Sequence, residues 1–375
     1  MSHDRGCSCG KESYEYKDCT ERSCNKVGNK NITREALVFI GRFQPFHIGH
    51  ESVIQEALKQ AKQVVVVVGS SFTARTTKNP FTFAERKQMI KAVFPTDRVV
   101  VVPVGDFPYD DTKWVAAVQS AVTTAIPSVK DIGLIGHSKD SSSYYLKIFP
   151  QWKKHVEVED VSGINATDIR KALLGNNKEQ LDVSTVVSKT VYKLLATIIA
   201  DGPDGYADFW LDIRTEFMFN EKYKEAWKSA PFPPTFVTVD SVVVQSGHVL
   251  LVTRKKSPGR GLWALPGGFL NQEEAIEDAM IRELVEETQI KLQPQVLKGS
   301  IAANAVFDKP DRDPRGRTIT HAYYLQLKDM ETLPHIKGAD DAEKAEWVPI
   351  NMVLQNRDRF YADHFHIIAH FLKIG

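Results

Sequence analysis

The stretch GRFQPFHIGH, from Gly41 to His50, decides the fold of the first half of the chain. It follows the apolar run 36–41 (ALVFIG), which predicts a buried strand, and leads into residues 50–62, whose apolar positions repeat at the spacing of one helix face. Such a strand delivers the backbone to the carboxyl edge of a sheet, where ligands bind in open α/β folds. His47 and His50 then lie at the first turn of the helix, where free backbone N–H groups favour an anion.

Strand and helix patterns continue to alternate after this stretch. They predict strands at 64–69, 99–104 and 132–136, and helices at 83–94 and 114–126. The strands lack polar alternation, which is typical of a parallel sheet covered on both faces. We therefore expect a doubly wound, Rossmann-like α/β domain that a helix over 183–200 closes.

Length and composition favour two globular domains, because the 375 residues are 42% hydrophobic and 25% charged. We expect a tail at 1–30, a first domain at 31–202, a linker at 203–234 and a second domain at 235–375. The net charge of +1 argues against nucleic acid and membrane surfaces as partners. No apolar run is long enough to span a bilayer and no secretory signal opens the chain, so a cytoplasmic location is expected. The oligomeric state is left open, and a homo-oligomer is compatible with these features.

The tail carries every cysteine of the chain, at Cys7, Cys9, Cys19 and Cys24. Four clustered thiols are able to hold one zinc ion, but their spacing matches none of the common zinc patterns. Because the segment is polar and poor in apolar residues, a flexible tail is the favoured interpretation.

The second half has a mixed α/β pattern. Strands are predicted at 235–244, 249–254, near 296–303 and at 320–327, with a helix at 274–287. On that helix Glu283, Glu286 and Glu287 share one face. No basic residue is expected at the positions that would pair with them, and a hard divalent cation, Mg²⁺ or alternatively Mn²⁺, relieves such repulsion. A solvated acidic face is the alternative interpretation.

The stretch 41–50 resembles the G-x-F-x-P-x-H-x-G-H signature of the nucleotidyltransferase superfamily at every fixed position. Residues 164–170 (INATDIR) resemble its second motif, with Asn165 in place of the usual Ser. The resemblance implies that His47, His50 and Arg170 stabilise charge on the transferred phosphates and that Thr167 hydrogen-bonds a phosphate oxygen. The further residues expected to contact the nucleotide are Gly41, Arg42, Phe43 and Gly49.

The stretches 69–86 and 135–152 look like those of nicotinamide-mononucleotide (NMN) adenylyltransferases that carry a fused Nudix domain. This resemblance implies that NMN attacks the α-phosphate of ATP with the help of Mg²⁺, giving NAD and pyrophosphate without a side-chain nucleophile. Trp114 is a candidate platform for the cationic nicotinamide ring, and a core position on its helix is the alternative. An acceptor other than NMN, such as pantetheine phosphate, is the alternative substrate.

Residues 268–290 are similar to the Nudix box, G-x5-E-x7-R-E-U-x-E-E-x-G-U, in which U is aliphatic. The positions that fit are Gly268, Glu274, Arg282, Glu283, Leu284, Glu286, Glu287 and Ile290. The resemblance implies an α/β/α fold for the second domain. It also implies Mg²⁺-dependent hydrolysis, with Glu283, Glu286 and Glu287 as metal ligands and Arg282 orienting the loop through Glu274. The general base is left open. Gln289 stands where the box has glycine, and a left-handed Gln there costs about 1 kcal/mol.

Residues 312–317 (RDPRGR) look like the ADP-ribose pyrophosphatase branch of the Nudix family. The resemblance implies ADP-ribose as substrate, AMP and ribose 5-phosphate as products, and Arg312, Arg315 and Arg317 as contacts to phosphates or ribose. An ordinary basic turn is the alternative.

Some Nudix-related proteins are instead transcriptional repressors that sense ADP-ribose and append a winged helix. Only about 25 residues follow Trp347–Pro349, and no basic recognition stripe is visible. The complete carboxylate set therefore favours turnover over sensing.

Overall fold

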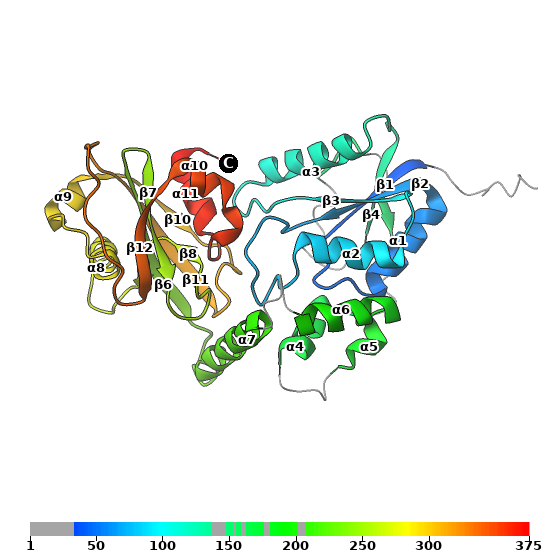
Figure 1. Cartoon of the computed structure of the whole chain (residues 1–375), viewed down its shortest axis with the longest axis horizontal. Coiled ribbons are helices and arrows are strands. Elements are labelled where there is room, and N and C mark those ends of the chain that lie inside the picture. Colours follow the sequence, from blue (N-terminus) through cyan, green and yellow to red (C-terminus); the bar gives the residue numbers. More distant parts are fainter. Residues whose placement is uncertain are drawn as a thin grey trace, which may run out of the picture.

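The computed structural model describes residues 34–136, 148–152, 155–158, 163–175, 181–201 and 208–374. Within these residues the chain forms two sheets in separate domains, with one helix running between them (Figure 1). The cysteine tail lies outside the described residues, so both of its interpretations stay predictions. None of the described helices has the length and apolar character that crossing a membrane requires.

The first sheet is parallel and is built from the predicted apolar runs. Its order is β3-β2-β1-β4-β5, with every neighbouring pair parallel. The strands are β1 (Arg34–Gly41), β2 (Ala61–Val68), β3 (Val99–Pro103), β4 (Ile132–Gly136) and β5 (His155–Glu157). Consecutive strands extend outward from β1 on one side, and the chain then crosses to β4 on the other, so β1 and β4 flank the point where the strand order reverses.

Helices cover both faces of this sheet, as the doubly wound prediction requires. The helices are α1 (Ile48–Gln60), α2 (Phe83–Val93), α3 (Asp111–Ala125), α4 (Ala166–Leu174), α5 (Val183–Val186) and α6 (Lys189–Asp201). Side chains of α1, α2, α4 and α6 form one core with Val64, Val66 and Val68. Those of α3 form another with Val65 and Val67. The alternation along β2 thus serves two cores.

The single helix predicted over 183–200 is wrong, because the chain there forms the two helices α5 and α6. Val187 separates them with an extended backbone (φ −126°, ψ 153°) and is buried in the core of the first domain. Burial of this side chain outweighs the helical continuity that the apolar spacing suggested.

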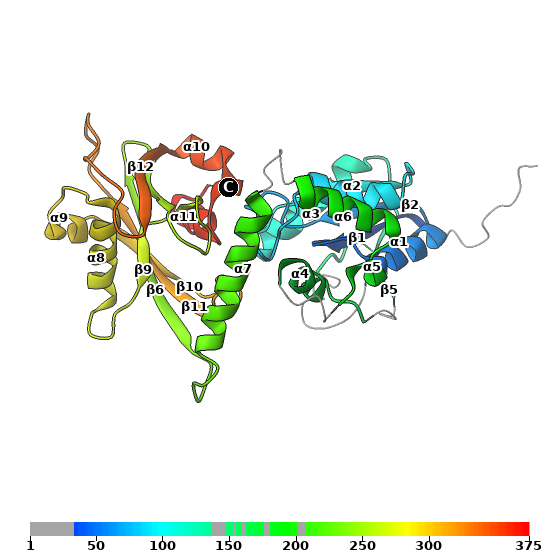
Figure 2. The same cartoon turned by 60° about the horizontal axis from the view of Figure 1, so that its bottom comes forward.

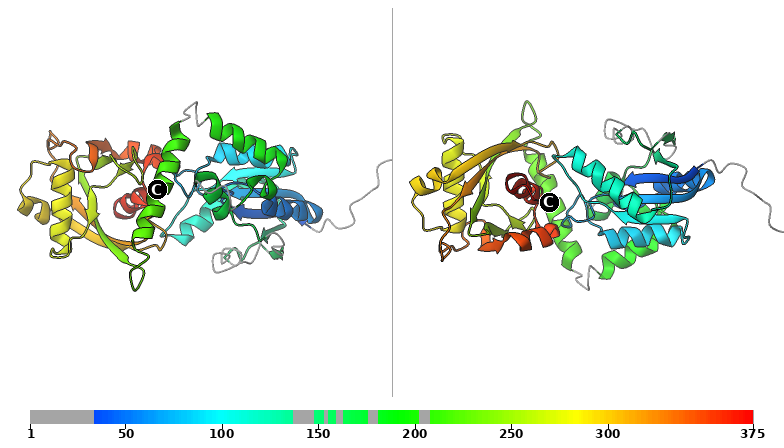
Figure 3. Two further views of the ribbon diagram at one scale, coloured as in Figure 1. Left: turned by 90° about the horizontal axis from the view of Figure 1, so that it is seen from below. Right: turned by 90° about the horizontal axis from the view of Figure 1, so that it is seen from above.

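The predicted linker contains a long helix, α7 (Asp208–Ala226), which runs between the domains in every view (Figures 1, 2 and 3). On the first domain, the Trp210 ring packs 5.4 Å from that of Phe81, and its indole N–H donates to the carbonyl of Ile198 at 2.8 Å. On the second domain, the Glu216 carboxylate accepts a 2.7 Å hydrogen bond from the backbone N–H of Gly259. The linker is therefore a helix that packs on both domains.

The second domain is a mixed sheet between helices. Its order is β10-β11-β6-β7-β12, with β8 beside β7 and β9 beside β6, and only β11 and β6 are parallel among these pairs. The strands are β6 (Thr235–Gln245), β7 (His248–Arg254), β8 (Trp263–Ala264), β9 (Gly267–Phe269), β10 (Ile301–Phe307), β11 (Arg317–Gln326) and β12 (Ala342–Pro349). The helices are α8 (Ile276–Thr288), α9 (Pro294–Gly299), α10 (Ile350–Gln355) and α11 (His364–Leu372), with a 3₁₀ turn at Arg357–Arg359.

Helices α8 and α11 cover opposite faces of this sheet, which confirms the expected α/β/α arrangement. The strand predicted near 296–303 is wrong in its first half. Residues 294–299 form α9 instead. Pro294 stands in the first turn of this helix, where its missing N–H costs nothing, and Leu297 is buried in the core that α8 also contacts. The strand β10 begins only at Ile301.

We predict that Trp210→Ala lowers the free energy of unfolding of the first domain by about 3 kcal/mol or more, because it empties a buried site and removes an indole hydrogen bond. Urea denaturation followed by circular dichroism measures this change. Leu211→Ala is the control, since the neighbouring side chain is 65% exposed and its loss should cost less than about 0.5 kcal/mol. Equal effects of the two substitutions would show that α7 does not pack as described.

Candidate active sites

The two motif histidines lie together where β1 passes into α1. The backbone N–H of His47, the N-cap residue of α1, donates to Nδ1 of His50 at 3.3 Å. Their rings stack with centroids 3.6 Å apart, and His47 is buried. Both rings thus stand at the positive end of the α1 dipole, beside the point where the strand order reverses. Such a site suits a phosphate.

The second motif reaches the first through Arg170 of α4. Its guanidinium donates to the Gln44 carbonyl at 2.8 Å and to the Thr167 hydroxyl at 3.1 Å. Burial and the nearby charge of Arg42 lower the pKa of Arg170 to about 10, so it remains a cation at neutral pH. The two motifs, distant in sequence, therefore form one cationic site. Asn165 caps α4 by accepting from the Thr167 N–H at 2.9 Å, a role that the usual Ser of the family pattern is equally able to fill.

Two of the residues predicted to contact the nucleotide, Gly41 and Phe43, also take part in core packing. A Cβ on Gly41 would lie 2.9 Å from the Phe43 ring, so this glycine makes room for packing. Phe43 is buried with a positive φ of 53°, and its ring packs 4.8 Å from that of His50. Trp114 lies on α3, and its ring packs 5.9 Å from that of Phe149 at the edge of the core on that face of the sheet. Gly49 lies in the first turn of α1 and Arg42 is exposed. Contact of these residues with substrate stays a prediction.

Sequence reasoning missed Arg86, the last residue of the stretch 69–86 that carried the family resemblance. Its side chain is fully buried and donates to the carbonyls of Arg42 (2.6 Å), Gly69 (2.7 Å) and Ser70 (3.0 Å). Burial lowers its pKa to about 10. Arg86 thus ties together the loops that leave β1 and β2. A charged residue on the buried face of the predicted helix 83–94 was the available signal.

Glu283, Glu286 and Glu287 form one face of α8, here called the acidic helix face, and this face packs against β9. Glu283 fills the space above Gly268, where a Cβ would meet its carboxyl at 2.5 Å. Glu287 is buried and accepts from the Gly267 N–H at 3.0 Å. Burial, reinforced by the charge of Glu283, raises the pKa of Glu287 to about 8. Two carboxylates crowded in a low-polarity site are the environment in which a divalent cation is favourable.

The expectation that no basic residue pairs with these carboxylates is wrong. One terminal nitrogen of Arg282, Nη1, lies 2.8 Å from Glu283 and 3.0 Å from Glu286. Arg282 and Glu286 are four residues apart on α8, which is a pairing distance that the sequence contained. The predicted contact with Glu274 is confirmed, at 2.9 and 2.6 Å. Within the described part of the chain, no group of three or more His, Cys, Asp or Glu side chains is arranged so that it could hold a metal ion. Two of the three carboxylates are paired with Arg282. The oxygen donors themselves fit a hard cation.

Gln289 has the left-handed backbone expected for a residue that replaces glycine. It ends α8 with φ 47° and ψ 33°, and its N–H donates to the Val285 carbonyl. The helix therefore stops where the family pattern predicts, with a strained residue at its end.

The arginines of the stretch 312–317 have protein partners. Arg312 donates two hydrogen bonds to the Asp363 carboxylate at 2.9 and 2.8 Å, and its side chain is only 5% exposed. Arg315 pairs with Asp313 at 2.7 Å and lies over the Phe269 ring. Arg317 donates to the backbone carbonyl of Asp308. These contacts shape the loop 308–316, and direct contact with ADP-ribose stays a prediction.

Two family models match the chain in this order. A cytidylyltransferase-like model matches residues 38–112, and a NUDIX domain model matches residues 234–371. The matched segments fall in the two structural domains. The first contains the histidine pair but not Arg170, and the second contains the acidic helix face.

Two curated relatives each match about a third of the chain. The nicotinamide/nicotinic acid mononucleotide adenylyltransferase of Acinetobacter baylyi is 47% identical over 140 residues, which cover 36% of this chain and 73% of the relative. The ADP-ribose pyrophosphatase of Methanocaldococcus jannaschii is 35% identical over 137 residues, again 36% of this chain and 73% of the relative.

A solved structure matches the whole arrangement. It is a bifunctional NMN adenylyltransferase/ADP ribose pyrophosphatase from Francisella tularensis, complexed with AMP and a manganese ion. Its sequence is 36% identical, the TM-score is 0.81, and the match covers 91% of this chain and 99% of that one.

We predict that Gln289→Gly stabilises the second domain by up to about 1 kcal/mol, because glycine adopts the left-handed conformation without strain. Thermal unfolding followed by circular dichroism measures the change. Gln289→Ala is the matched control, since it removes the side chain but keeps the Cβ, and it should give no gain. A stabilisation by alanine equal to that by glycine would contradict backbone strain at this position.

Proposed function

This chain belongs to the family of bifunctional NMN adenylyltransferases/ADP-ribose pyrophosphatases, and we propose that each of its two domains houses one of these reactions. The first domain joins ATP and NMN, and the second hydrolyses ADP-ribose. The observation that carries the proposal is the structural match over 91% of the chain to an enzyme with both activities.

In the first domain, an NMN phosphate oxygen attacks the α-phosphorus of ATP. The bond from that phosphorus to the oxygen bridging the β-phosphate breaks, which releases pyrophosphate and leaves NAD. We assign to His47, His50 and Arg170 the role of stabilising the negative charge that moves onto the leaving pyrophosphate; the stacked histidine rings and the contact of Arg170 with the first motif support this assignment. The Thr167 hydroxyl accepts a hydrogen bond from Arg170, and we assign it a hydrogen bond to a phosphate oxygen of the same substrate.

In the second domain, water attacks the pyrophosphate of ADP-ribose and yields AMP and ribose 5-phosphate. Glu283, Glu286 and Glu287 are the residues that would hold Mg²⁺. When bound, the ion would neutralise the pyrophosphate and help to activate water. Nudix hydrolases are metal-dependent, and the Francisella structure contains manganese, so Mn²⁺ is the second candidate. The chain's own part is to hold the carboxylates against β9 through Gly267 and Gly268.

We predict that the two activities are separable by mutation. Glu286→Gln should reduce ADP-ribose hydrolysis at least about 100-fold and leave NAD synthesis unchanged, because it removes one carboxylate from the acidic helix face. His50→Ala should reduce NAD synthesis by about 10² to 10³-fold and leave hydrolysis unchanged. Both rates are measured on one preparation by chromatography of NAD and AMP. Loss of both activities from either substitution would refute separate sites.

We also predict that hydrolysis requires an added divalent cation. Dialysis against a chelator should abolish AMP release from ADP-ribose, and titration with Mg²⁺ should restore it, whereas Glu286→Gln protein should need a higher Mg²⁺ concentration for half-maximal rate. Full hydrolysis in the metal-free protein would contradict a role for the acidic helix face in holding a cation.

A further inference from the structure

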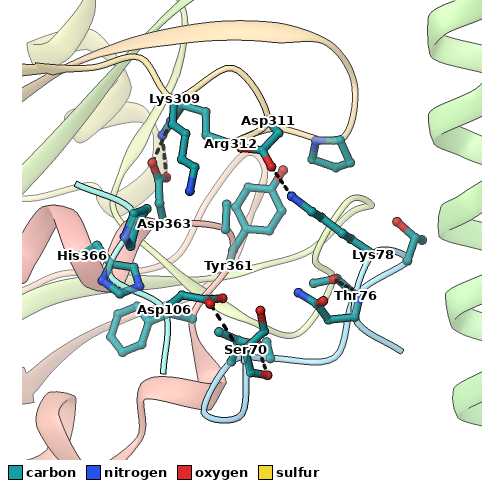
Figure 4. A pocket seen from close by; sticks show the side chains of 18 of the residues that line it. Ser70, Thr76, Lys78, Asp106, Lys309, Asp311, Arg312, Tyr361, Asp363 and His366 are labelled. Carbon is teal, nitrogen blue, oxygen red and sulfur yellow. Dashed lines mark hydrogen bonds and ion pairs between the residues drawn. The ribbon is translucent and has the colours of Figure 1, made fainter. Parts of the chain in front are cut away.

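Asp363 of the second domain forms a hydrogen bond with a residue of the first. Its carboxylate accepts from the hydroxyl of Tyr109, whose ring also packs 5.1 Å from that of Phe307. Both partners border a cavity of about 360 Å³ that lies between the domains (Figure 4). Tyr109 belongs to residues 104–110, the loop that joins β3 to α3. The contact therefore ties a loop at the carboxyl edge of the first sheet to the second domain.

Asp363 is a rigid partner for this loop. Arg312 donates two hydrogen bonds to its carboxylate, as Figure 4 shows, and the side chains of Arg312 and Asp363 are only 5% and 8% exposed. A buried bidentate pair of this kind has a defined geometry. Tyr109, in contrast, is 37% exposed and donates a single hydrogen bond from its hydroxyl. The second domain therefore provides the fixed position, and the loop of the first domain is the part that is held.

A second polar contact crosses the same boundary, but it is weaker. Lys78 and Asp311 form an ion pair, and their side chains are 39% and 54% exposed. Exposed pairs contribute little, because water and salt screen the two charges. A hydrogen bond to a buried carboxylate is among the stronger kinds. Of the two contacts, the one between Tyr109 and Asp363 is therefore the main attachment.

The loop 104–110 is connected to the histidine motif by hydrogen bonds within the first domain. The Asp106 carboxylate accepts from the Ser70 N–H at 3.2 Å, a contact drawn in Figure 4. The Ser70 carbonyl accepts from Arg86 at 3.0 Å, and Arg86 also donates to the carbonyl of Arg42 at 2.6 Å. Arg42 belongs to the histidine motif. A shift of the loop would therefore disturb the backbone that carries the catalytic histidines, and small misplacements of such groups slow a reaction strongly.

We propose that Asp363 of the Nudix domain is a positioning residue of adenylyl transfer, and that it acts by holding Tyr109 and with it the loop 104–110. The inference rests on the proposed function, and it gives the hydrolase domain a part in the reaction of its neighbour. Asp363 acts through Tyr109 and not through a contact with substrate. The effect of losing Asp363 therefore depends on whether the tyrosine hydroxyl is present.

The test is a double-mutant cycle on kcat/KM for NAD synthesis from ATP and NMN, measured in the full-length protein. Tyr109→Phe keeps the ring and removes only the hydroxyl, and it should lower kcat/KM about tenfold. Asp363→Ala should lower kcat/KM at least as much, and adding Tyr109→Phe to it should cause no further loss, because both substitutions remove one shared contact. Tyr192→Phe is the control, since Tyr192 lies on α6 with 45% of its surface exposed, and it should change nothing.

Hydrolysis of ADP-ribose in the same variants separates positioning from a general loss of structure. Tyr109→Phe should leave hydrolysis unchanged, since Arg312 still holds Asp363 in this variant. If Asp363→Ala fails to fold because Arg312 has lost its partner, Tyr109→Phe decides alone.

Three results would overturn the proposal. They are unchanged NAD synthesis in Tyr109→Phe, an equal loss of both activities in that variant, and multiplied effects of the two substitutions in a folded double variant. Absence of NAD synthesis in the unmodified protein would be a different outcome, since it would refute the proposed function and this inference with it.

Discussion

A guanidinium group inside a protein must find an oxygen acceptor for its N–H groups, and the sites of this molecule are built on that requirement. Arg86 is fully buried and satisfies it with the carbonyls at the ends of β1 and β2, which fixes the loops of the adenylyl-transfer site. Arg282 does the same for the acidic helix face, through Glu274, Glu283 and Glu286. In each case the sheet determines where the groups of the site lie, and the hydrogen bonds of one arginine hold those groups in a fixed arrangement.

Arg312 extends this principle across the domain boundary. It holds Asp363, which also accepts from Tyr109 of the first domain, and it lies 3.9 Å from Asp240 on β6. Asp240 in turn accepts from Thr320 at 2.6 Å and pairs in the sheet with Gly267, the residue that donates to Glu287. A continuous set of polar contacts therefore runs from the transferase edge to the carboxylates of the hydrolase.

The sequence contained the elements but not their tertiary partners. The strands of the first sheet were predictable because residues such as Val64–Val68 face two cores and carry no polar side chain. The histidine pair and the acidic helix face followed from spacing alone. In contrast, the Asp363 partner of Arg312 is 51 residues away, so nothing local distinguished a buried ion pair from a phosphate contact. The break at Val187 was hidden for the same reason, since packing and not propensity decides it.

The helix α7 fixes how the two domains are oriented relative to one another, because it is bound to both. In its first turn, Trp210 packs in the core of the first domain. Less than two turns later, Glu216 accepts a hydrogen bond from Gly259 of the second domain. One residue inserted between those anchors would rotate everything beyond it by about 100° and shift it about 1.5 Å. Chimaeras that exchange either domain must therefore preserve the helical phase of this spacer, and its length is as constrained as any side chain that touches a ligand.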